Sequence, residues 1–116
     1  MTMEKKEKLF ILWTSAEAET FDEMVFMYAM NGKKYAWWDE ITVVIWGASA
    51  RLAGEDHVVQ LKIKELIAAG VKVEACKACA DDLGVSGKLE ETGVVVKYWG
   101  RALTAVLKSD DRLISI

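Results

Sequence analysis

The chain has 116 residues, of which 53% are hydrophobic and 28% are charged, and its formal net charge is −3. This length fits one domain, and the composition is that of a globular protein rather than a disordered one. The slight acidic excess excludes a basic surface for nucleic acid, so we expect no nucleic-acid partner. The apolar runs are far shorter than the ~20 residues that span a membrane, so we expect a cytoplasmic protein without membrane contact.

Apolar, β-branched segments alternate with amphipathic ones, which is typical of parallel strands joined by crossover helices. We interpret residues 1–7 as an N-terminal tail and residues 8–116 as a single domain. Within this domain, the expected strands cover residues 8–14, 41–47, 71–76, 93–98 and 112–116. The interior of the sheet is expected to contain Leu9, Ile11, Val43, Val44, Ile45, Val73 and Val95.

The spacing of apolar residues predicts helices between these strands. The first covers residues 17–31 and ends at Gly32, and the second covers residues 54–69. A brief helix is expected over residues 77–83, a polar loop follows it, and a last helix covers residues 101–108. Such a chain of five strands and four helices forms a three-layer α/β/α sandwich with a five-stranded parallel sheet, and its site lies at the carboxyl ends of the strands.

Two cysteines, Cys76 and Cys79, follow the third expected strand with C-x-x-C spacing. Free backbone amides at the start of a helix favour a thiolate, and Lys77 adds a cation, whereas Asp81 and Asp82 oppose it. Simple core packing of the two cysteines is an equally good interpretation of this spacing. Thioredoxin-like chemistry is disfavoured, because that fold supports its motif with a cis-proline loop and this chain has no proline.

Other kinds of site have weaker support. His57 and the two cysteines give only three candidate zinc ligands, so no metal site is expected and His57 is interpreted as a surface residue. Neither of the glycine-rich phosphate-binding motifs occurs, so Gly47 gives no support for nucleotide binding. The hydroxyl groups of Thr14, Ser15 and Ser49 are suited to binding an anion, although helix capping is the better interpretation of each.

Three tryptophans, Trp13, Trp46 and Trp99, stand at expected strand ends. Their placement predicts an aromatic-lined crevice at the same edge of the sheet as Cys76, although core filling or a subunit contact is favoured over ligand binding.

Two further tryptophans, Trp37 and Trp38, are adjacent before the second strand, so at least one of them should be exposed or covered by a partner. Together with the methionines of the first helix, they predict a homo-oligomer.

Three segments resemble the DsrE family, the small α/β proteins of sulfur-relay systems. They are WWDEITVVIWGAS at residues 37–49, KELIAAGVKVEACKACADDLGV at residues 64–85 and DDRLISI at residues 110–116. The resemblance implies a parallel five-stranded sheet in the order 4-3-2-1-5 and a homo-oligomer.

The resemblance also implies a function. The strand-end cysteine of relay members carries sulfur as a persulfide, and Cys76 stands at that position, while Cys79 is an extra cysteine with a secondary role. We therefore expect a sulfurtransferase-type carrier in which Cys76 is the more reactive thiol and is reached through the crevice. Sulfur-donor and sulfur-acceptor proteins are the expected partners, and no metal or organic cofactor is expected. The alternative is a non-catalytic module for a small ligand or partner, bound through Trp13, Thr14, Ser15, Trp46, Gly47, Ser49, Lys77 and Trp99.

Overall fold

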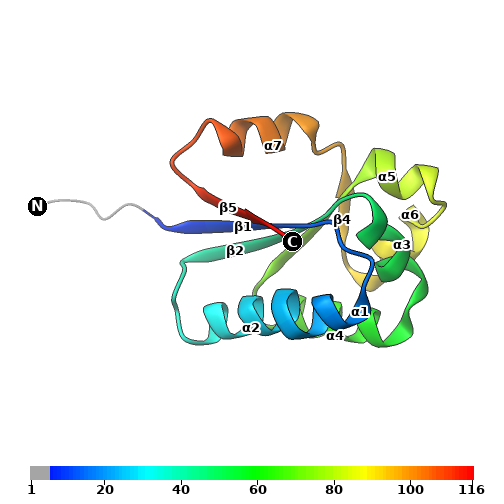
Figure 1. Ribbon diagram of the computed structural model, residues 1–116, viewed down its shortest axis with the longest axis horizontal. Coiled ribbons are helices and arrows are strands. Elements are labelled where there is room, and N and C mark those ends of the chain that lie inside the picture. Colours follow the sequence, from blue (N-terminus) through cyan, green and yellow to red (C-terminus); the bar gives the residue numbers. More distant parts are fainter. Residues whose placement is uncertain (1–5) are drawn as a thin grey trace, which may run out of the picture.

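The computed structural model describes residues 6–116, so residues 1–5 of the expected tail lie outside the described residues. Its centre is a five-stranded sheet in the order β4-β3-β2-β1-β5, in which every neighbouring pair is parallel (Figure 1). The strands are β1 (Lys8–Trp13), β2 (Glu40–Ile45), β3 (Lys72–Cys76), β4 (Val95–Lys97) and β5 (Arg112–Ser115). The predicted fold class and strand order are confirmed.

Helices cover both faces of the sheet (Figure 1). One face is covered by α4 (His57–Ala68) and by a continuous segment of α1 (Ala18–Thr20), the π-helix η1 (Phe21–Phe26) and α2 (Met27–Lys34). The other face carries α7 (Gly100–Leu107). At the carboxyl ends of the strands lie α3 (Ala48–Glu55), α5 (Lys77–Asp82) and α6 (Ser86–Thr92), packed on one another. None of the helices within residues 6–116 combines the length and hydrophobicity needed to cross a membrane.

The alternation of side chains along each strand divides the core into two unequal clusters. Ile11 and Trp13 belong to the larger cluster, on the side of α2 and α4, where burying a side chain such as Ile11 contributes about 1.5–3 kcal/mol. Phe10 and Leu12 point the other way and pack in the smaller cluster, on the side of α7. Cys76 belongs to this smaller cluster, so the candidate thiol lies on the α7 side of the sheet.

Val95 is 54% exposed, so its predicted burial is wrong, whereas the other expected interior residues are buried. It belongs to β4, an edge strand of three residues, and lies opposite Glu74 of β3. An apolar run has the same appearance in an edge strand as in a central one, because the sequence pattern does not contain the order of the strands.

Gly32 does not end the first helix, which continues to Lys34. Instead, Gly32 is buried where the helix approaches β2, and a Cβ atom there would lie 2.8 Å from the Cδ1 atom of Ile41. The glycine is therefore explained by close packing of the helix on the sheet rather than by termination.

The other helix boundaries also differ from the prediction. The helix expected over residues 54–69 is divided in two, and α4 begins after Asp56, whose carboxylate accepts a hydrogen bond from the Val59 N–H at 3.0 Å. The segment predicted as a polar loop contains α6, in which Leu89 is fully buried. A short helix with few apolar residues gives too weak a periodic signal to be predicted.

Trp37 and Trp38 lie in the bend between α2 and β2 and have different environments. The indole N–H of Trp38 donates to the hydroxyl of Tyr28 at 3.1 Å, whereas Trp37 is 53% exposed. Met27 and Tyr35 are exposed as well. Burial of this surface by a second copy of the chain stays a prediction, and light scattering at micromolar concentration would contradict it by finding a monomer.

Replacing Gly54 with alanine should destabilise the fold. A Cβ atom at this position would lie 2.5 Å from the Cβ atom of the buried Val85, and overpacking of this kind costs about 1–3 kcal/mol. Gly87→Ala is the matched control, since a Cβ atom there has no heavy atom within 4 Å. Alanine at this position should stabilise α6 by about 0.5–1 kcal/mol. Chemical denaturation measures both changes, and equal effects would contradict the close approach of Gly54 to Val85.

Candidate functional site

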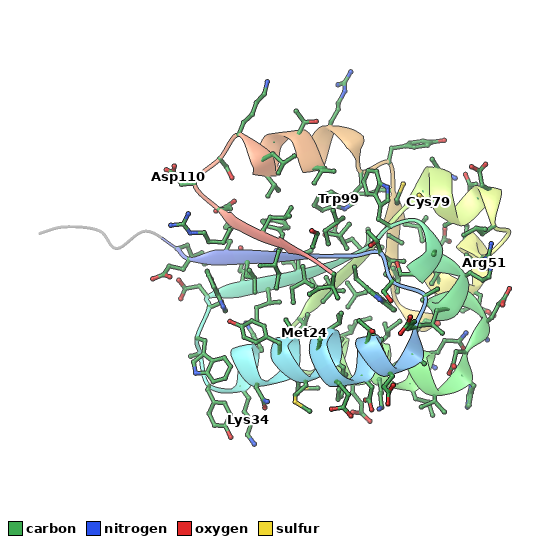
Figure 2. The ribbon with its side chains drawn as sticks, in the orientation of Figure 1. Met24, Lys34, Arg51, Cys79, Trp99 and Asp110 are labelled. Atoms are coloured by element: carbon green, nitrogen blue, oxygen red, sulfur yellow. The ribbon has the colours of Figure 1, made fainter. Side chains whose placement is uncertain are left out.

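The carboxyl ends of β1, β2 and β3 lie next to one another, because these strands are neighbours in the sheet. Binding sites of open parallel sheets lie beyond such strand ends. Trp46 and Gly47 follow β2 at this edge, and Cys76 is the last residue of β3. Figure 2 shows the Cys79 side chain near the same end of the sheet, on the side of α5. The structure thus brings the C-x-x-C segment and the β2–α3 corner together.

Cys76 is the last residue of β3 and the N-cap of α5, and Cys79 lies in the first turn of that helix. Both are free thiols. Cys76 is only 4% exposed and packs in the same cluster as Val44 and Trp99, whereas Cys79 is partly exposed. The more accessible thiol of the pair is therefore Cys79, and the expected access to Cys76 through a crevice is wrong.

The pKa of the Cys79 thiol is raised above its ordinary value. Partial burial is the main cause, and a hydrogen bond with Cys76 adds to it. Electrostatic repulsion from Cys76 and Asp82 also raises this pKa, while a hydrogen bond from the Gly47 backbone lowers it. Cys79 is therefore mainly protonated at neutral pH, and its thiolate fraction grows as the pH rises.

Two free thiols that pack together, as Cys76 and Cys79 do, can exchange sulfur with one another. Thiol exchange proceeds by direct attack of a thiolate on a sulfur atom, so either cysteine is placed to attack a sulfur carried by the other. The same contact allows the pair to close as a disulfide. His57 is exposed, as predicted, and residues 6–116 contain no group of three His, Cys, Asp or Glu side chains placed to hold a metal ion.

Lys77 lies between the two cysteines in the sequence, but its charge is paired with Asp81. The Lys77 ammonium lies 2.8 Å from the Asp81 carboxylate and 5.7 Å from the centre of the Tyr98 ring. The hydrogen bond with Asp81 raises the pKa of Lys77, and Asp81 also accepts from the Ser86 hydroxyl at 2.6 Å. The carboxylate of Asp81 therefore largely cancels the effect that the positive charge of Lys77 was predicted to have on the thiols.

The three candidate hydroxyls each have a partner within the chain. Ser49 is fully buried and bonds to the backbone of Trp13 and Trp46, so its predicted role as a ligand donor is wrong. The Thr14 hydroxyl donates to the carbonyl of Ile116 at 3.0 Å.

The Ser15 hydroxyl accepts from the Glu17 N–H at 3.1 Å, which makes a local turn. None of the three hydroxyls caps its helix: Glu17 and Gly47 are the N-cap residues of α1 and α3. The capping interpretation is therefore also wrong.

The predicted crevice lined by tryptophans is absent from the described part of the chain. Trp13 is fully buried in the larger cluster, where it stacks on Phe21 with ring centres 4.5 Å apart. Trp46 and Trp99 belong to the smaller cluster on the other face. Trp13 lies opposite Ile45 in the β1–β2 register, so the next residue, Trp46, points to the opposite side of the sheet.

Glu74 lies near Cys76 and was not predicted as part of the site. It lies two residues before Cys76 on β3, so both side chains point to the same face of the sheet. Its carboxylate accepts from the indole N–H of Trp99 at 2.9 Å and pairs with the Lys97 ammonium at 3.0 Å. Side chains alternate between the two faces of a strand, so the spacing of two residues could have predicted that Glu74 lies on the same face as Cys76.

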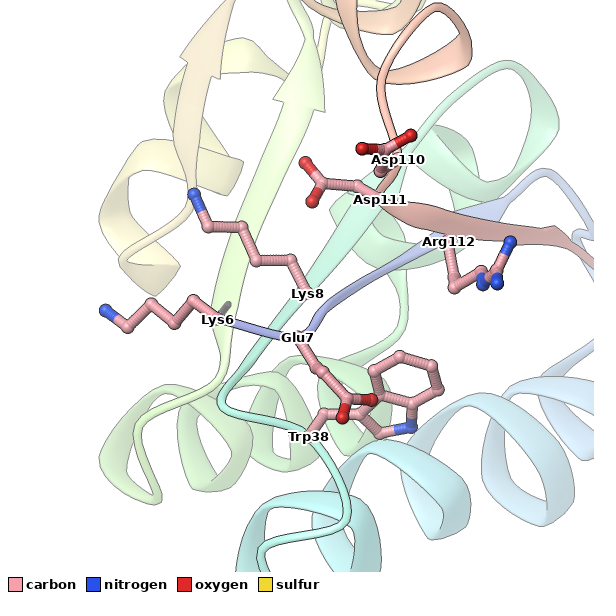
Figure 3. Close-up of a pocket in the computed structure, with 7 residues that line it drawn as sticks. All are labelled: Lys6, Glu7, Lys8, Trp38, Asp110, Asp111 and Arg112. Atoms are coloured by element: carbon pink, nitrogen blue, oxygen red, sulfur yellow. The ribbon is translucent and has the colours of Figure 1, made fainter. Parts of the chain in front are cut away.

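A hollow of about 270 Å³ lies at the other end of the sheet, near the amino ends of β1 and β5 (Figure 3). Its lining combines three cations with three carboxylates, so its charges favour neither an anion nor a cation. The lining residues are Lys6, Glu7, Lys8, Trp38, Asp110, Asp111 and Arg112. This hollow contains no thiol, and it carries no part of the site described above.

The fold and the site define a class of small α/β proteins with a five-stranded parallel sheet and a thiol at the carboxyl end of the third strand. Comparison with protein families matches residues 7–116 to the DsrE/DsrF-like family. The chain belongs to this family, which is associated with sulfur relay. No curated protein matches it.

Three solved structures share the fold. The conserved protein of unknown function BT1422 from Bacteroides thetaiotaomicron is 39% identical, with a TM-score of 0.92 and 95% of each chain covered. The ychN protein from E. coli is 17% identical, with a TM-score of 0.70, over 95% of this chain and 99% of that one. MTH1491 from Methanobacterium thermoautotrophicum, also of unknown function, is 19% identical, with a TM-score of 0.73, over 97% and 100%.

Alkylation of Cys79 should accelerate steadily with pH. Because its pKa is raised, the thiolate fraction should increase about tenfold per pH unit from 7 to 9. Labelling with iodoacetamide followed by trypsin measures this rate, since cleavage after lysine places Cys76 in residues 73–77 and Cys79 in residues 78–88. A Cys79 rate that reaches a plateau below about pH 8 would contradict the raised pKa.

Proposed function

We propose that the protein is a sulfur carrier of the sulfurtransferase type, in which Cys79 receives sulfur from a donor and Cys76 holds it as a persulfide. The observation that carries this proposal is that a partly exposed thiol, Cys79, packs against the cluster that contains the buried thiol of Cys76. A carrier needs an accessible group to take up sulfur and a protected group to keep it. Membership of the DsrE/DsrF-like family supports the same chemistry.

Uptake on this proposal moves one sulfur atom between thiols. The Cys79 thiolate attacks the outer sulfur of a donor persulfide, the S–S bond of the donor breaks, and the donor leaves as a thiolate. The Cys76 thiolate then attacks that same outer sulfur, so Cys79 regains its thiolate and Cys76 becomes the persulfide. Each step forms one S–S bond and breaks another, so neither an oxidant nor a reductant is needed.

The pair also provides a second way for the sulfur to leave. When the Cys79 thiolate attacks the inner sulfur of the Cys76 persulfide, a Cys76–Cys79 disulfide forms and HS⁻ departs. This step reduces the carried sulfur by two electrons and oxidises the two thiols, so a dithiol reductant must restore them. Delivery to an acceptor thiol requires no such repair and is the route that sustains repeated transfer.

The alternative, a non-catalytic binding module, has less support. It depended on a crevice lined by tryptophans, and Trp13 and Trp99 are buried in clusters on opposite faces of the sheet. Sulfur-donor and sulfur-acceptor proteins remain part of the proposal, because sulfur has to be brought to Cys79 and taken from it.

Incubation with a persulfide donor should add about 32 Da per sulfur atom to the wild-type protein. After alkylation and trypsin digestion, most of the added sulfur should be found on residues 73–77, which contain Cys76. Cys79→Ser should slow this loading by about tenfold or more, because it removes the accessible thiol in front of the buried one. Mass spectrometry of the two peptides over time measures both effects.

Cys76→Ser is the matched variant, and its added sulfur should appear on residues 78–88 and be lost quickly to free thiols. Loading of Cys76 at the wild-type rate in Cys79→Ser would show that Cys79 is not the receiving thiol. Absence of added sulfur from the wild type and from both variants would rule out the carrier function.

A further inference from the structure

The corner between β2 and α3 depends on one glycine. Gly47 is the N-cap of α3, with φ +70° and ψ −131°, a conformation that is essentially confined to glycine. No heavy atom lies within 4 Å of the place where a Cβ atom would be. The glycine is therefore required by the direction of the backbone and not by lack of space.

The buried hydroxyl of Ser49 holds this corner in place. It accepts a hydrogen bond from the Trp46 N–H at 3.1 Å, and its own proton is directed at two carbonyl oxygens. These belong to Trp13, at 2.5 Å, and Trp46, at 3.2 Å. The Trp46 N–H also donates to the Trp13 carbonyl at 3.1 Å, so both polar backbone groups of Trp46 are held.

The orientation of the Trp46–Gly47 peptide decides where the Gly47 N–H points. The described chain has no cis peptide bond, and in a trans peptide the C=O and N–H groups point in opposite directions. The Trp46 carbonyl of this peptide faces the Ser49 hydroxyl, so the Gly47 N–H faces away from it. Trp46 and Cys79 pack against the same cluster, and the pairing of Ile45 with Ala75 places this corner beside the start of α5. The Gly47 backbone also lowers the pKa of the Cys79 thiol, as a nearby N–H group does.

We propose that Ser49 is a positioning residue for Cys79, because it fixes the Trp46–Gly47 peptide so that the Gly47 N–H donates to the Cys79 sulfur anion. The inference rests on the proposed function, since this anion is the one that attacks the donor and leaves again when sulfur moves to Cys76. The titratable groups that face Cys79 are Cys76 and Asp82, and both disfavour a negative charge there. The Gly47 N–H acts against them.

The wild-type protein allows a direct test by NMR. The Gly47 amide proton should move downfield with the same titration midpoint as the Cβ carbon of Cys79, because a hydrogen bond strengthens when its acceptor becomes charged. Gly93, whose N–H donates to the Glu90 carbonyl at 3.0 Å, is the internal control and should not follow this midpoint. A Gly47 amide that does not respond to ionisation of Cys79 would overturn the proposal.

Substitutions separate positioning from folding. Ser49→Ala and Gly47→Ala should each slow alkylation of Cys79 about tenfold at pH 8 and move its pH profile upward. Gly84→Ala is the matched control, since Gly84 also has φ +70° and open surroundings, and it should lower thermal stability without moving the profile. Folded Ser49→Ala and Gly47→Ala proteins with unchanged profiles would overturn the inference, and the wild-type titration decides if neither variant folds.

Neither measurement requires a sulfur donor. A protein that never takes up sulfur can still show the bond between Gly47 and Cys79, and a carrier can transfer sulfur without it. Failure of the positioning role is therefore distinguishable from failure of the carrier function.

Discussion

The register of β1 against β2 is the constraint on which the rest of the structure depends. Trp13 lies opposite Ile45, and both side chains pack in the larger cluster on one face of the sheet. The next residue, Trp46, packs in the smaller cluster on the other face. The same register brings the end of β1 within reach of the Ser49 hydroxyl. The β2–β3 register ends with Ile45 opposite Ala75, so the residues that follow, Trp46 and Cys76, lie at the same end of the sheet. The thiol pair and the corner that faces it both follow from these two pairings.

Much of the fold could be predicted, because central parallel strands are long apolar runs that differ clearly from the segments between them. The predicted strand order came from family resemblance, since periodicity does not contain it. The ends of the helices, and the presence of the short helix α6, were less predictable. Gly32 has the character of a helix stop but permits a close contact with Ile41, and Leu89 is too isolated among polar residues to reveal α6.

The location of the candidate site could also be predicted, because the strand-end rule and the C-x-x-C spacing both point to Cys76 and Cys79. Which of the two cysteines is buried, and which backbone group faces them, could not be predicted. Burial of Cys76 depends on how Trp99 and α7 pack against β3, which involves residues distant in sequence. The orientation of the Gly47 N–H depends on three hydrogen bonds made by a serine whose sequence position suggested a helix cap.

The short strands at the two edges of the sheet have a consequence for solubility. β4 has three residues and ends at Lys97, and β5 has four and begins at Arg112. Unpaired backbone groups along an exposed edge are a template on which strands of other chains can add, and short edges that carry charged residues limit this addition. The chain can therefore keep strongly apolar central strands while presenting little edge for aggregation.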